Sequence, residues 1–297
     1  MSATSFAGWM KSVQDRAEQA LDTYLPAVAA VPHKLHEAMR YTSLGGGKRV
    51  RPLLVYASGA LFGADEAALA RAASAVEMIH VYSLVHDDMP CMDDDALRRG
   101  KPTVHVAYDE ATALLVGDAL QAQAFQVLAD CDTLPPARVL SMLRLLARAA
   151  GSAGMCGGQA IDLDSVGTAL TLGQLEQMHQ LKTGAMLRVS VLLGALCGKE
   201  LEPRELEALD AYAKAIGLAF QVVDDVLDAT ADSATLGKTA GKDAADNKPT
   251  YVSILGLEPS RALAEKLRRD AHEALAPFGE QALRLRDLAD LIVQRKA

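Results

Sequence analysis

Several residue patterns that would define a disulfide-rich, zinc-binding or nucleic-acid-binding protein are absent from this 297-residue chain. The 4 cysteines (Cys91, Cys131, Cys156 and Cys197) show no paired spacing typical of a zinc site or a CxxC redox motif, so we expect reduced thiols. Lysine and arginine number 30 against 38 acidic residues, and the formal charge of −8 argues against nucleic-acid binding. An anionic partner would therefore need metal ions and local basic groups.

Targeting and membrane signals are also missing. The N-terminal stretch up to residue 25 contains acidic residues and has no apolar core, so it predicts neither a signal peptide nor a transit peptide. No run looks long and apolar enough to span a bilayer, and we expect no membrane contact. These absences predict a soluble, cytoplasmic protein.

Runs of β-branched residues and hairpin dipeptides are scarce, whereas alanine and leucine are abundant and 50% of the chain is hydrophobic. This composition predicts an all-α protein. We expect helices to start near Pro52, Pro203 and Pro259. The expected helices span 5–24, 33–43, 52–62, 65–87, 105–130, 136–155, 171–197, 203–228, 249–256, 259–276 and 279–296. No change in composition marks a boundary, so one domain over 1–297 is predicted.

Two aspartate tracts carry most of the functional information: DDMPCMD at 87–93 and DDVLD at 224–228. Each follows a stretch that otherwise indicates a buried helix. Ionised carboxylates among core residues are costly unless positive charge compensates them, so the tracts suggest divalent ions held between facing helices. Carboxylate ligands without a His or Cys cluster favour Mg²⁺. A DDxxD tract alone is also compatible with a solvated acidic helix end.

The spacing within each tract predicts different local structures. Asp224 and Asp228 share a helix face, with Asp225 displaced by ~100°. On a regular helix Asp87 and Asp93 would lie ~120° out of line. Because proline at position 90 disfavours a continuous helix, we expect the helix to end near Asp88 and Asp93 to reach the same ion from the loop beyond.

Basic residues occur where phosphates could be held. The glycine-rich segment GGGKRVRP at 45–52 carries Lys48, Arg49 and Arg51 before a helix start, an arrangement that favours an anion but does not match a P-loop. Arg98 and Arg99 follow the first aspartate tract; alone, such a pair would be an ordinary exposed pair.

His80 precedes the first tract by about two helical turns, ~10 Å along the axis. It is either a satisfied core residue or part of a second anion site. Residues 229–250 are small, polar and rich in Lys and Asp. They predict either an ordinary surface loop or a mobile lid that carries Lys238 and Lys248 over the site. The C-terminal LADLIVQRKA could supply basic groups, but we expect a frayed, solvated tail.

Taken together, these residues resemble the trans-isoprenyl diphosphate synthase family, most closely its bacterial farnesyl diphosphate synthases. The resemblance covers nearly the whole chain. It rests on GGKRVRP at 46–52, the run from His80 through DDMPCMDDDALRRGKPT, GDALQ at 117–121, GQAIDL at 158–163, KTG at 182–184, FQVVDDVLD at 220–228, LGKTAGKD and NKPTY. It implies an all-α helical bundle with a central active-site cavity, and head-to-tail joining of isopentenyl diphosphate to an allylic diphosphate, usually with three Mg²⁺ ions.

The resemblance also implies roles for matching positions. Metal ligands would be Asp87, Asp93 and Asp224, supported by Asp88, Asp225 and Asp228. Isopentenyl diphosphate would be held by Lys48, Arg51, His80 and Arg99. The allylic diphosphate would be held by Arg98, Lys182, Thr183, Gln221, Lys238 and Lys248, and of these Lys182, Thr183 and Gln221 would be catalytic. The departing diphosphate would take the final proton.

An aromatic residue at Tyr82 with a small one at Ser83 resembles the farnesyl pattern, in which bulk below the first tract limits the product; plain core packing is the alternative for Tyr82. A geranylgeranyl or geranyl diphosphate synthase, a class I terpene cyclase and an inactive regulatory subunit remain as alternatives. A cyclase has no second diphosphate to hold, and an inactive subunit would be expected to lose aspartates. The family is generally homodimeric, and prenyl diphosphates are the expected partners.

Overall fold

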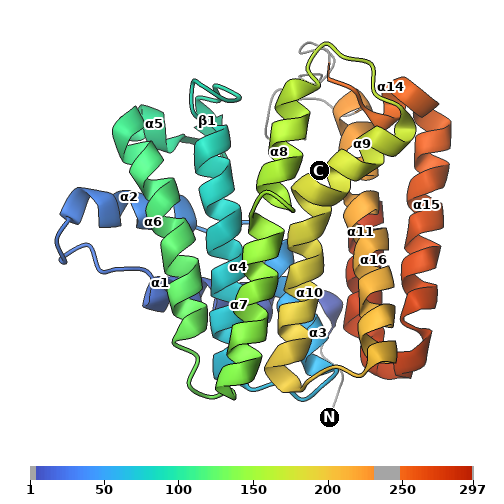
Figure 1. Ribbon diagram of the computed structural model, residues 1–297, viewed down its shortest axis with the longest axis horizontal. Helices are drawn as coiled ribbons and strands as arrows, with labels where there is room; N and C mark the ends of the chain where they lie inside the picture. The colour runs from blue at the N-terminus through green and yellow to red at the C-terminus, as the bar shows by residue number, and fades with distance from the viewer. Residues whose placement is uncertain (1–4, 231–247, 296–297) are drawn as a thin grey trace. The chain divides into compact units, whose positions relative to one another are not determined.

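The computed structural model describes residues 5–230 and 248–295, and the chain is all-α (Figure 1). Within the described ranges the only strands are β1 (Leu97–Arg98) and β2 (Lys101–Pro102), which form a short antiparallel hairpin. The helices are α1 (Phe6–Tyr24), α2 (His33–Ser43), α3 (Val50–Ala60), α4 (Glu66–Asp87), α5 (Val104–Ala107), α6 (Glu110–Ala129), α7 (Pro136–Ala150), α8 (Met155–Asp164), α9 (Leu172–His179), η1 (Gln180–Gly184), α10 (Ala185–Gly198), α11 (Pro203–Thr230), α14 (Tyr251–Leu255), α15 (Leu257–Ala274), η2 (Ala276–Ala282) and α16 (Leu283–Gln294).

The chain divides into two compact units. Unit 1 comprises Met1–Leu143 and Leu193–Lys199, and unit 2 comprises Arg144–Leu192 and Glu200–Ala297.

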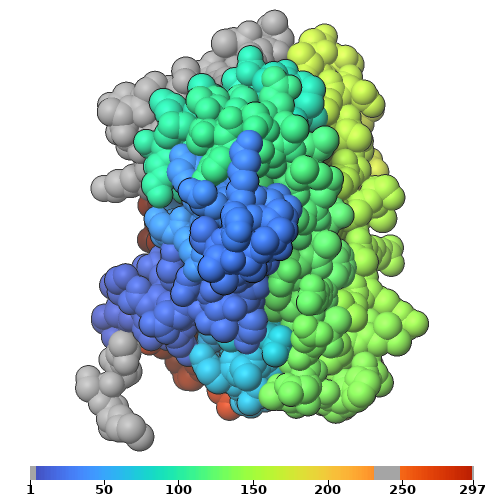
Figure 2. Space-filling view, turned by 90° about the vertical axis from the view of Figure 1, so that its left-hand side faces the viewer, coloured from blue at the N-terminus to red at the C-terminus, as the bar shows by residue number. Residues whose placement is uncertain are grey.

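In unit 1, α4 is the central helix and packs against α1, α3 and α6. Asp65 caps its first turn by accepting a hydrogen bond from the backbone N–H of Ala68 at 2.9 Å. Most of its residues are buried, including runs of small side chains that let neighbouring helices approach. Figure 2 shows α1 and α2, in blue, at the surface of this unit. The position of the first aspartate tract is therefore set by a helix held on several sides.

In unit 2, the long helix α11 packs against η1, α14, α15 and α16. Pro203 is its first residue, as expected for a proline that needs no hydrogen-bond donor there. η1 is π-helical and lies between α9 and α10, and Thr171 and Gln174 form a capping box at the start of α9. π-Helical turns occur often at functional sites, and this one contains Lys182.

Three local expectations were wrong. Residues 155–164 form α8, whereas no helix was expected between residues 155 and 171. The predicted helix 105–130 is divided into α5 and α6, because Asp109 caps α6 by accepting from Thr112 N–H at 2.6 Å. The hairpin β1–β2 was not expected, since its strands are only 2 residues long.

One stretch, Leu172–Gly198, is long and apolar enough by length and composition to cross a membrane, contrary to the expectation from the sequence. Of the most apolar 18-residue window in this stretch, 72% is buried inside the protein. A core helix shows the same burial, so length and composition alone do not identify it as a membrane span.

Candidate active site

The first aspartate tract lies at the end of α4, as Pro90 predicts. The helix ends at Asp87 and Asp88 occupies the cap position. The chain then folds back, because the backbone N–H of Asp93 donates to the carbonyl oxygen of Asp87 at 2.8 Å. This hydrogen bond brings the backbones of Asp87 and Asp93 together at one helix end.

Asp88 is 3% exposed and forms an ion pair with Arg98. Both of its carboxylate oxygens accept from Arg98 Nε, at 2.8 and 2.9 Å, and Oδ1 also accepts from Arg98 Nη2 at 2.5 Å. Asp95 lies 3.7 Å from the same guanidinium. A bidentate carboxylate contact fixes the plane of an arginine, so Asp88 orients Arg98 beside the first tract.

The aspartates of the second tract differ in exposure. Asp225 and Asp228 are 6% and 8% exposed, whereas the Asp224 side chain is 38% exposed. Asp225 Oδ2 accepts from the backbone N–H of Tyr251 at 2.7 Å. Asp224 Oδ1 accepts from Arg295 Nη2 at 2.6 Å. Asp224 is therefore the most accessible carboxylate of this tract, and it is paired with the guanidinium group of Arg295.

The donor chemistry of the two tracts fits a hard divalent cation. Asp87, Asp93 and Asp224 offer only carboxylate oxygens, and Asp228 Oδ1 is buried with no hydrogen-bond partner among the described residues. Across the described ranges, no three His, Cys, Asp or Glu side chains gather as a closed cage. Mg²⁺ usually takes one or two protein carboxylates and completes its shell with water and phosphate oxygens, so this sparse donor set suits it.

Arg51, Arg99 and His80 form a second polar group in unit 1. Desolvation, followed by the charges of Arg51 and Arg99, holds the pKa of His80 well below its usual range, so the imidazole is neutral at pH 7. Burial also lowers the pKa of Arg51, and Glu77 opposes this effect. Arg51 Nε is buried and has no hydrogen-bond acceptor within the described part of the chain. Clustered guanidinium groups with an unmatched donor fit an anion.

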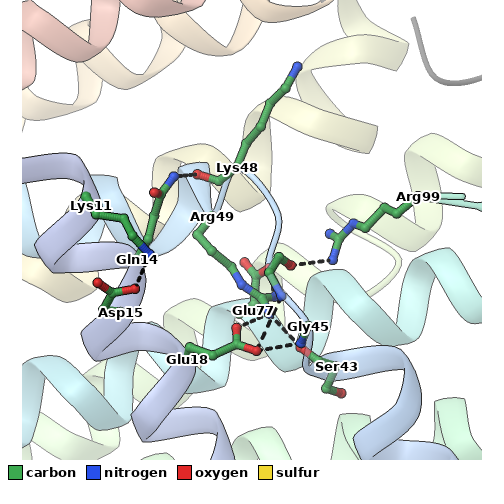
Figure 3. Close-up of polar contacts among 11 residues, drawn as sticks. Lys11, Gln14, Asp15, Glu18, Ser43, Gly45, Lys48, Arg49, Glu77 and Arg99 are labelled. Atoms are coloured by element: carbon green, nitrogen blue, oxygen red, sulfur yellow. Dashed lines mark hydrogen bonds and ion pairs between the residues drawn. The ribbon is translucent and has the colours of Figure 1, made fainter. Parts of the chain in front are cut away.

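Lys48 and Arg99 approach this region differently. Arg99 Nη1 donates to the carbonyl oxygen of Gly46 at 3.1 Å, which places the guanidinium against the glycine-rich loop. Figure 3 shows the Lys48 side chain extending away from Arg49 and Arg99. The structure thus brings Arg51, Arg99 and His80 into one electrostatic group, and it does not bring the Lys48 side chain to Arg99.

Lys182, Thr183 and Gln221 are held by specific contacts in unit 2. Lys182 Nζ forms an ion pair with Asp162 Oδ2 at 2.5 Å, and Thr183 Oγ1 donates to Gln221 Oε1 at 2.7 Å. A Cβ at Gly158 would lie 2.1 Å from the backbone nitrogen of Lys182. Only glycine permits this approach, which brings α8 and its Asp162 next to η1.

The two residues expected to set product length occupy different environments. Tyr82 is 5% exposed and its ring meets the His86 ring edge-on, with centroids 5.8 Å apart. His86 Nε2 lies 3.0 Å from the carbonyl oxygen of Leu114 on α6. Ser83 is half-buried and its hydroxyl donates to the His80 carbonyl at 2.8 Å. The Tyr82 ring is therefore oriented by a neighbouring aromatic group that is itself anchored.

Part of the expected lid falls outside the described residues. Lys238 lies in 231–247 and its placement is not described, so the proposal of a lid over 229–250 stays a prediction. Lys248 is described and half-buried.

The sequence did not reveal several side chains that hold the candidate site. The expectation of a solvated C-terminal tail was wrong for Arg295, whose side chain is 11% exposed and lies 3.9 Å above the Phe220 ring while it pairs with Asp224. Asp162 was noted only as part of a motif. Glu77 is an acidic residue in the otherwise apolar sequence of α4. This pattern was the feature of the sequence that could have indicated the buried ion pair between Glu77 and Arg49.

Comparisons with known proteins agree on one family. The family model described as Polyprenyl synthetase matches residues 32–278. The chain is 48% identical over 295 residues to the farnesyl diphosphate synthase of Escherichia coli, covering 98% of this chain and 99% of that protein. A solved apo structure of a FPP/GFPP synthase from Zymomonas mobilis has a TM-score of 0.88 at 43% identity, covering 97% and 98% of the two chains. A Helicobacter pylori geranyltransferase, solved in complex with magnesium and isoprenyl diphosphate, has a TM-score of 0.84 at 31% identity, covering 98% and 97%.

Proposed function

The chain belongs to the polyprenyl synthetase family, and from this membership we propose that it is a farnesyl diphosphate synthase. In this reaction, isopentenyl diphosphate condenses head-to-tail with dimethylallyl diphosphate and then with geranyl diphosphate, releasing diphosphate at each step. The observation that carries the proposal is the 48% identity to the E. coli farnesyl diphosphate synthase over nearly the whole of both chains.

We propose that Mg²⁺ is held by Asp87 and Asp93 of unit 1 and by Asp224 of unit 2, and that three ions bind together with substrate diphosphate. The carboxylate-only donor set and the magnesium complex of the H. pylori relative support this assignment. When bound, Mg²⁺ would neutralise the charge that develops on the departing diphosphate.

The basic residues divide into two proposed diphosphate sites. Isopentenyl diphosphate would be held by Lys48, Arg51, His80 and Arg99; the buried, unmatched donor of Arg51 supports this assignment. The allylic diphosphate would be held by Arg98, Lys182, Thr183, Gln221, Lys238 and Lys248. Arg98 and Lys182 are already oriented by carboxylates, Asp88 and Asp162.

The proposed chemistry explains these residue types. The allylic C–O bond breaks, its electron pair leaves with the diphosphate, and an allylic cation remains. Fixed Arg98 and Lys182 charges stabilise the leaving group without supplying a proton. The double bond of isopentenyl diphosphate then attacks the cation to form the new C–C bond, and the departing diphosphate takes the proton lost from the adduct. Thr183 and Gln221 present oriented dipoles along the cation, where water would be destructive.

The length of the product would depend on the residues below the first aspartate tract. Buried Tyr82 supports termination at C15. Plant relatives named geranylgeranyl pyrophosphate synthase are 45–46% identical to this chain, so geranylgeranyl diphosphate is the second candidate product. We further propose that the chain acts as one catalytic domain, forms a homodimer and is cytoplasmic.

Product analysis tests the proposal directly. The purified protein is incubated with Mg²⁺, isopentenyl diphosphate and either dimethylallyl or geranyl diphosphate, and the products are identified by mass after dephosphorylation. Farnesol as the main product is expected. A main product of C20 or longer would replace the farnesyl assignment. Conversion of geranyl diphosphate to a hydrocarbon without consumption of isopentenyl diphosphate would instead indicate a terpene cyclase.

A further inference from the structure

The glycine-rich loop before α3 has an unusual backbone. Gly45, Gly46 and Gly47 have φ values of 97°, 93° and 127°, and Arg49 has φ of 50°. Glycine adopts positive φ at little cost, but arginine does not. Because Lys48 and Arg51 flank this residue, the conformation of the loop determines where both cations lie. Contacts from outside the loop must therefore stabilise the Arg49 conformation.

Helix α1 supplies those contacts from one face (Figure 3). Glu18 Oε1 accepts from the backbone N–H groups of Gly45 at 2.5 Å and Gly46 at 3.3 Å, and Glu18 Oε2 accepts from Arg49 Nη2 at 2.7 Å. One turn earlier, Gln14 Nε2 donates to the carbonyl oxygen of Lys48 at 3.1 Å. The two side chains together contact both ends of the loop.

The other side of Arg49 is enclosed by α4. The residue is 2% exposed, its Nη1 lies 2.7 Å from Glu77 Oε1, and its Nη2 also donates to the Ser43 carbonyl at 2.7 Å. Burial opposes the ionisation of Glu18, but hydrogen bonds from Gly45 and Arg49 hold the pKa of its carboxyl below the usual value. Glu18 is thus an anion at neutral pH, and removing it would leave a buried guanidinium with one carboxylate partner instead of two.

We propose that Glu18 and Gln14 are positioning residues for the isopentenyl diphosphate site. They hold the glycine-rich loop so that Lys48 and Arg51 are presented to the substrate, and they touch no substrate themselves. The inference rests on the proposed function, because it assumes that these two cations hold isopentenyl diphosphate. α1 lies outside residues 32–278 matched by the family model, so the model assigns it no role.

The test compares substitutions on the loop-facing side of α1 with a matched control. Glu18→Ala removes every contact of this side chain, Glu18→Gln keeps an acceptor for Gly45 but loses the charge, and Gln14→Ala removes one hydrogen bond. Asp15→Asn is the control, because Asp15 is exposed and pairs only with Lys11 among the contacts the structure gives it. Steady-state kinetics for each substrate, circular dichroism and calorimetric titration of isopentenyl diphosphate without allylic substrate are measured for each variant.

We expect Glu18→Ala to raise the KM and the calorimetric Kd for isopentenyl diphosphate about tenfold, since it removes a charge-assisted pair and two backbone hydrogen bonds. The KM for the allylic substrate should change less than about twofold, because the substitution weakens only the binding of isopentenyl diphosphate. Gln14→Ala and Glu18→Gln should raise the isopentenyl KM about threefold, the loss expected for one hydrogen bond. Asp15→Asn should match the wild type.

An unchanged isopentenyl KM in Glu18→Ala would overturn the inference, and so would an equal rise in both KM values. If Glu18→Ala does not fold, Glu18→Gln and Gln14→Ala decide the question by the same split between the two substrates. The Arg51→Ala variant distinguishes a failure of the inference about α1 from a failure of the proposed function. If this variant weakens isopentenyl diphosphate binding but the α1 variants do not, the proposed function stands and the inference fails. If the wild-type protein forms no prenyl product, the proposed function itself fails.

Discussion

Gly158 offers the sharpest test of how the protein orients Lys182. A Cβ at this position would lie 2.1 Å from the nitrogen and 2.5 Å from the Cα of Lys182. Both are backbone atoms, so Gly158→Ala cannot be accommodated by a rotamer change and α8 must move away from η1. Overpacking of this kind costs about 1–3 kcal/mol of folding free energy. The melting temperature should fall by about 2–4 °C for each kcal/mol in a chain approaching this size.

The same shift should damage catalysis more than stability. Asp162 lies on α8 and holds Lys182 Nζ at 2.5 Å, so separating the two helices lengthens or breaks this pair. A misplacement of about 1 Å at a catalytic group can cost about 100-fold in rate. We therefore expect Gly158→Ala to lower kcat about 100-fold while the protein remains folded at 25 °C. Steady-state kinetics and differential scanning calorimetry measure the two effects.

Gly173→Ala is the matched control. Gly173 lies in the first turn of α9, and a Cβ there would meet no atom within 4 Å. Alanine in a helix is favoured over glycine by about 0.5–1 kcal/mol, so this variant should be as stable as the wild type or more stable, with unchanged kcat. A Gly158→Ala protein with wild-type melting temperature and turnover would refute the reasoning, because the close approach of α8 to η1 would then have no energetic consequence.

Two further predictions concern the candidate site, and a third concerns the buried His179 at the end of α9. Asp87→Ala or Asp224→Ala should nearly abolish turnover while circular dichroism stays unchanged, and retention of most activity in either variant would contradict the metal assignment. Tyr82→Ala should lengthen the main product to C20 or beyond, and an unchanged C15 product by mass would remove Tyr82 from the account. His179 is buried with both ring nitrogens unpartnered among the described residues, and burial lowers its pKa to about 4. Between an unfolded pKa of about 6.5 and this value the unfolded state binds more protons, so stability should fall as pH drops through that window, by at most about 1.4 kcal/mol per pH unit. His179→Phe, which can keep the stacking on Tyr251, should flatten this dependence in thermal melts at pH 5 and 7.5.

The long helices were predictable because their local signals agree. The expected end of the helix at 65–87 matches α4, since Asp65 caps one end and Pro90 disfavours continuation beyond the other. The helix α8 was not predictable in the same way. Its two glycines, Gly157 and Gly158, lower the intrinsic helix propensity, and the close approach to η1 that Gly158 permits exists only in the folded chain.

The candidate site was only partly predictable, for a related reason. Charged residues within apolar stretches can be recognised in a sequence, and both aspartate tracts were identified in this way. The loop at 45–52 was recognised by its glycines and its three basic residues. Which charge pairs with which cannot be recognised, because the partners are far apart in the chain. Arg295 pairs with Asp224, and Glu18 and Glu77 enclose Arg49 from two different helices. The π-helical turn that carries Lys182 has no sequence signature either.

The two aspartate tracts illustrate what burial adds to a motif. Each begins with two adjacent aspartates, which the sequence presents as equivalents. Adjacent residues on a helix point ~100° apart, so both cannot face the same ion. In each tract the second aspartate is buried and partnered, Asp88 by Arg98 and Asp225 by the Tyr251 N–H, while Asp87 and Asp224 are more exposed. An ion that needs accessible oxygens would therefore bind the first aspartate of each pair, and the second would serve to fix the helix end or the cation beside it.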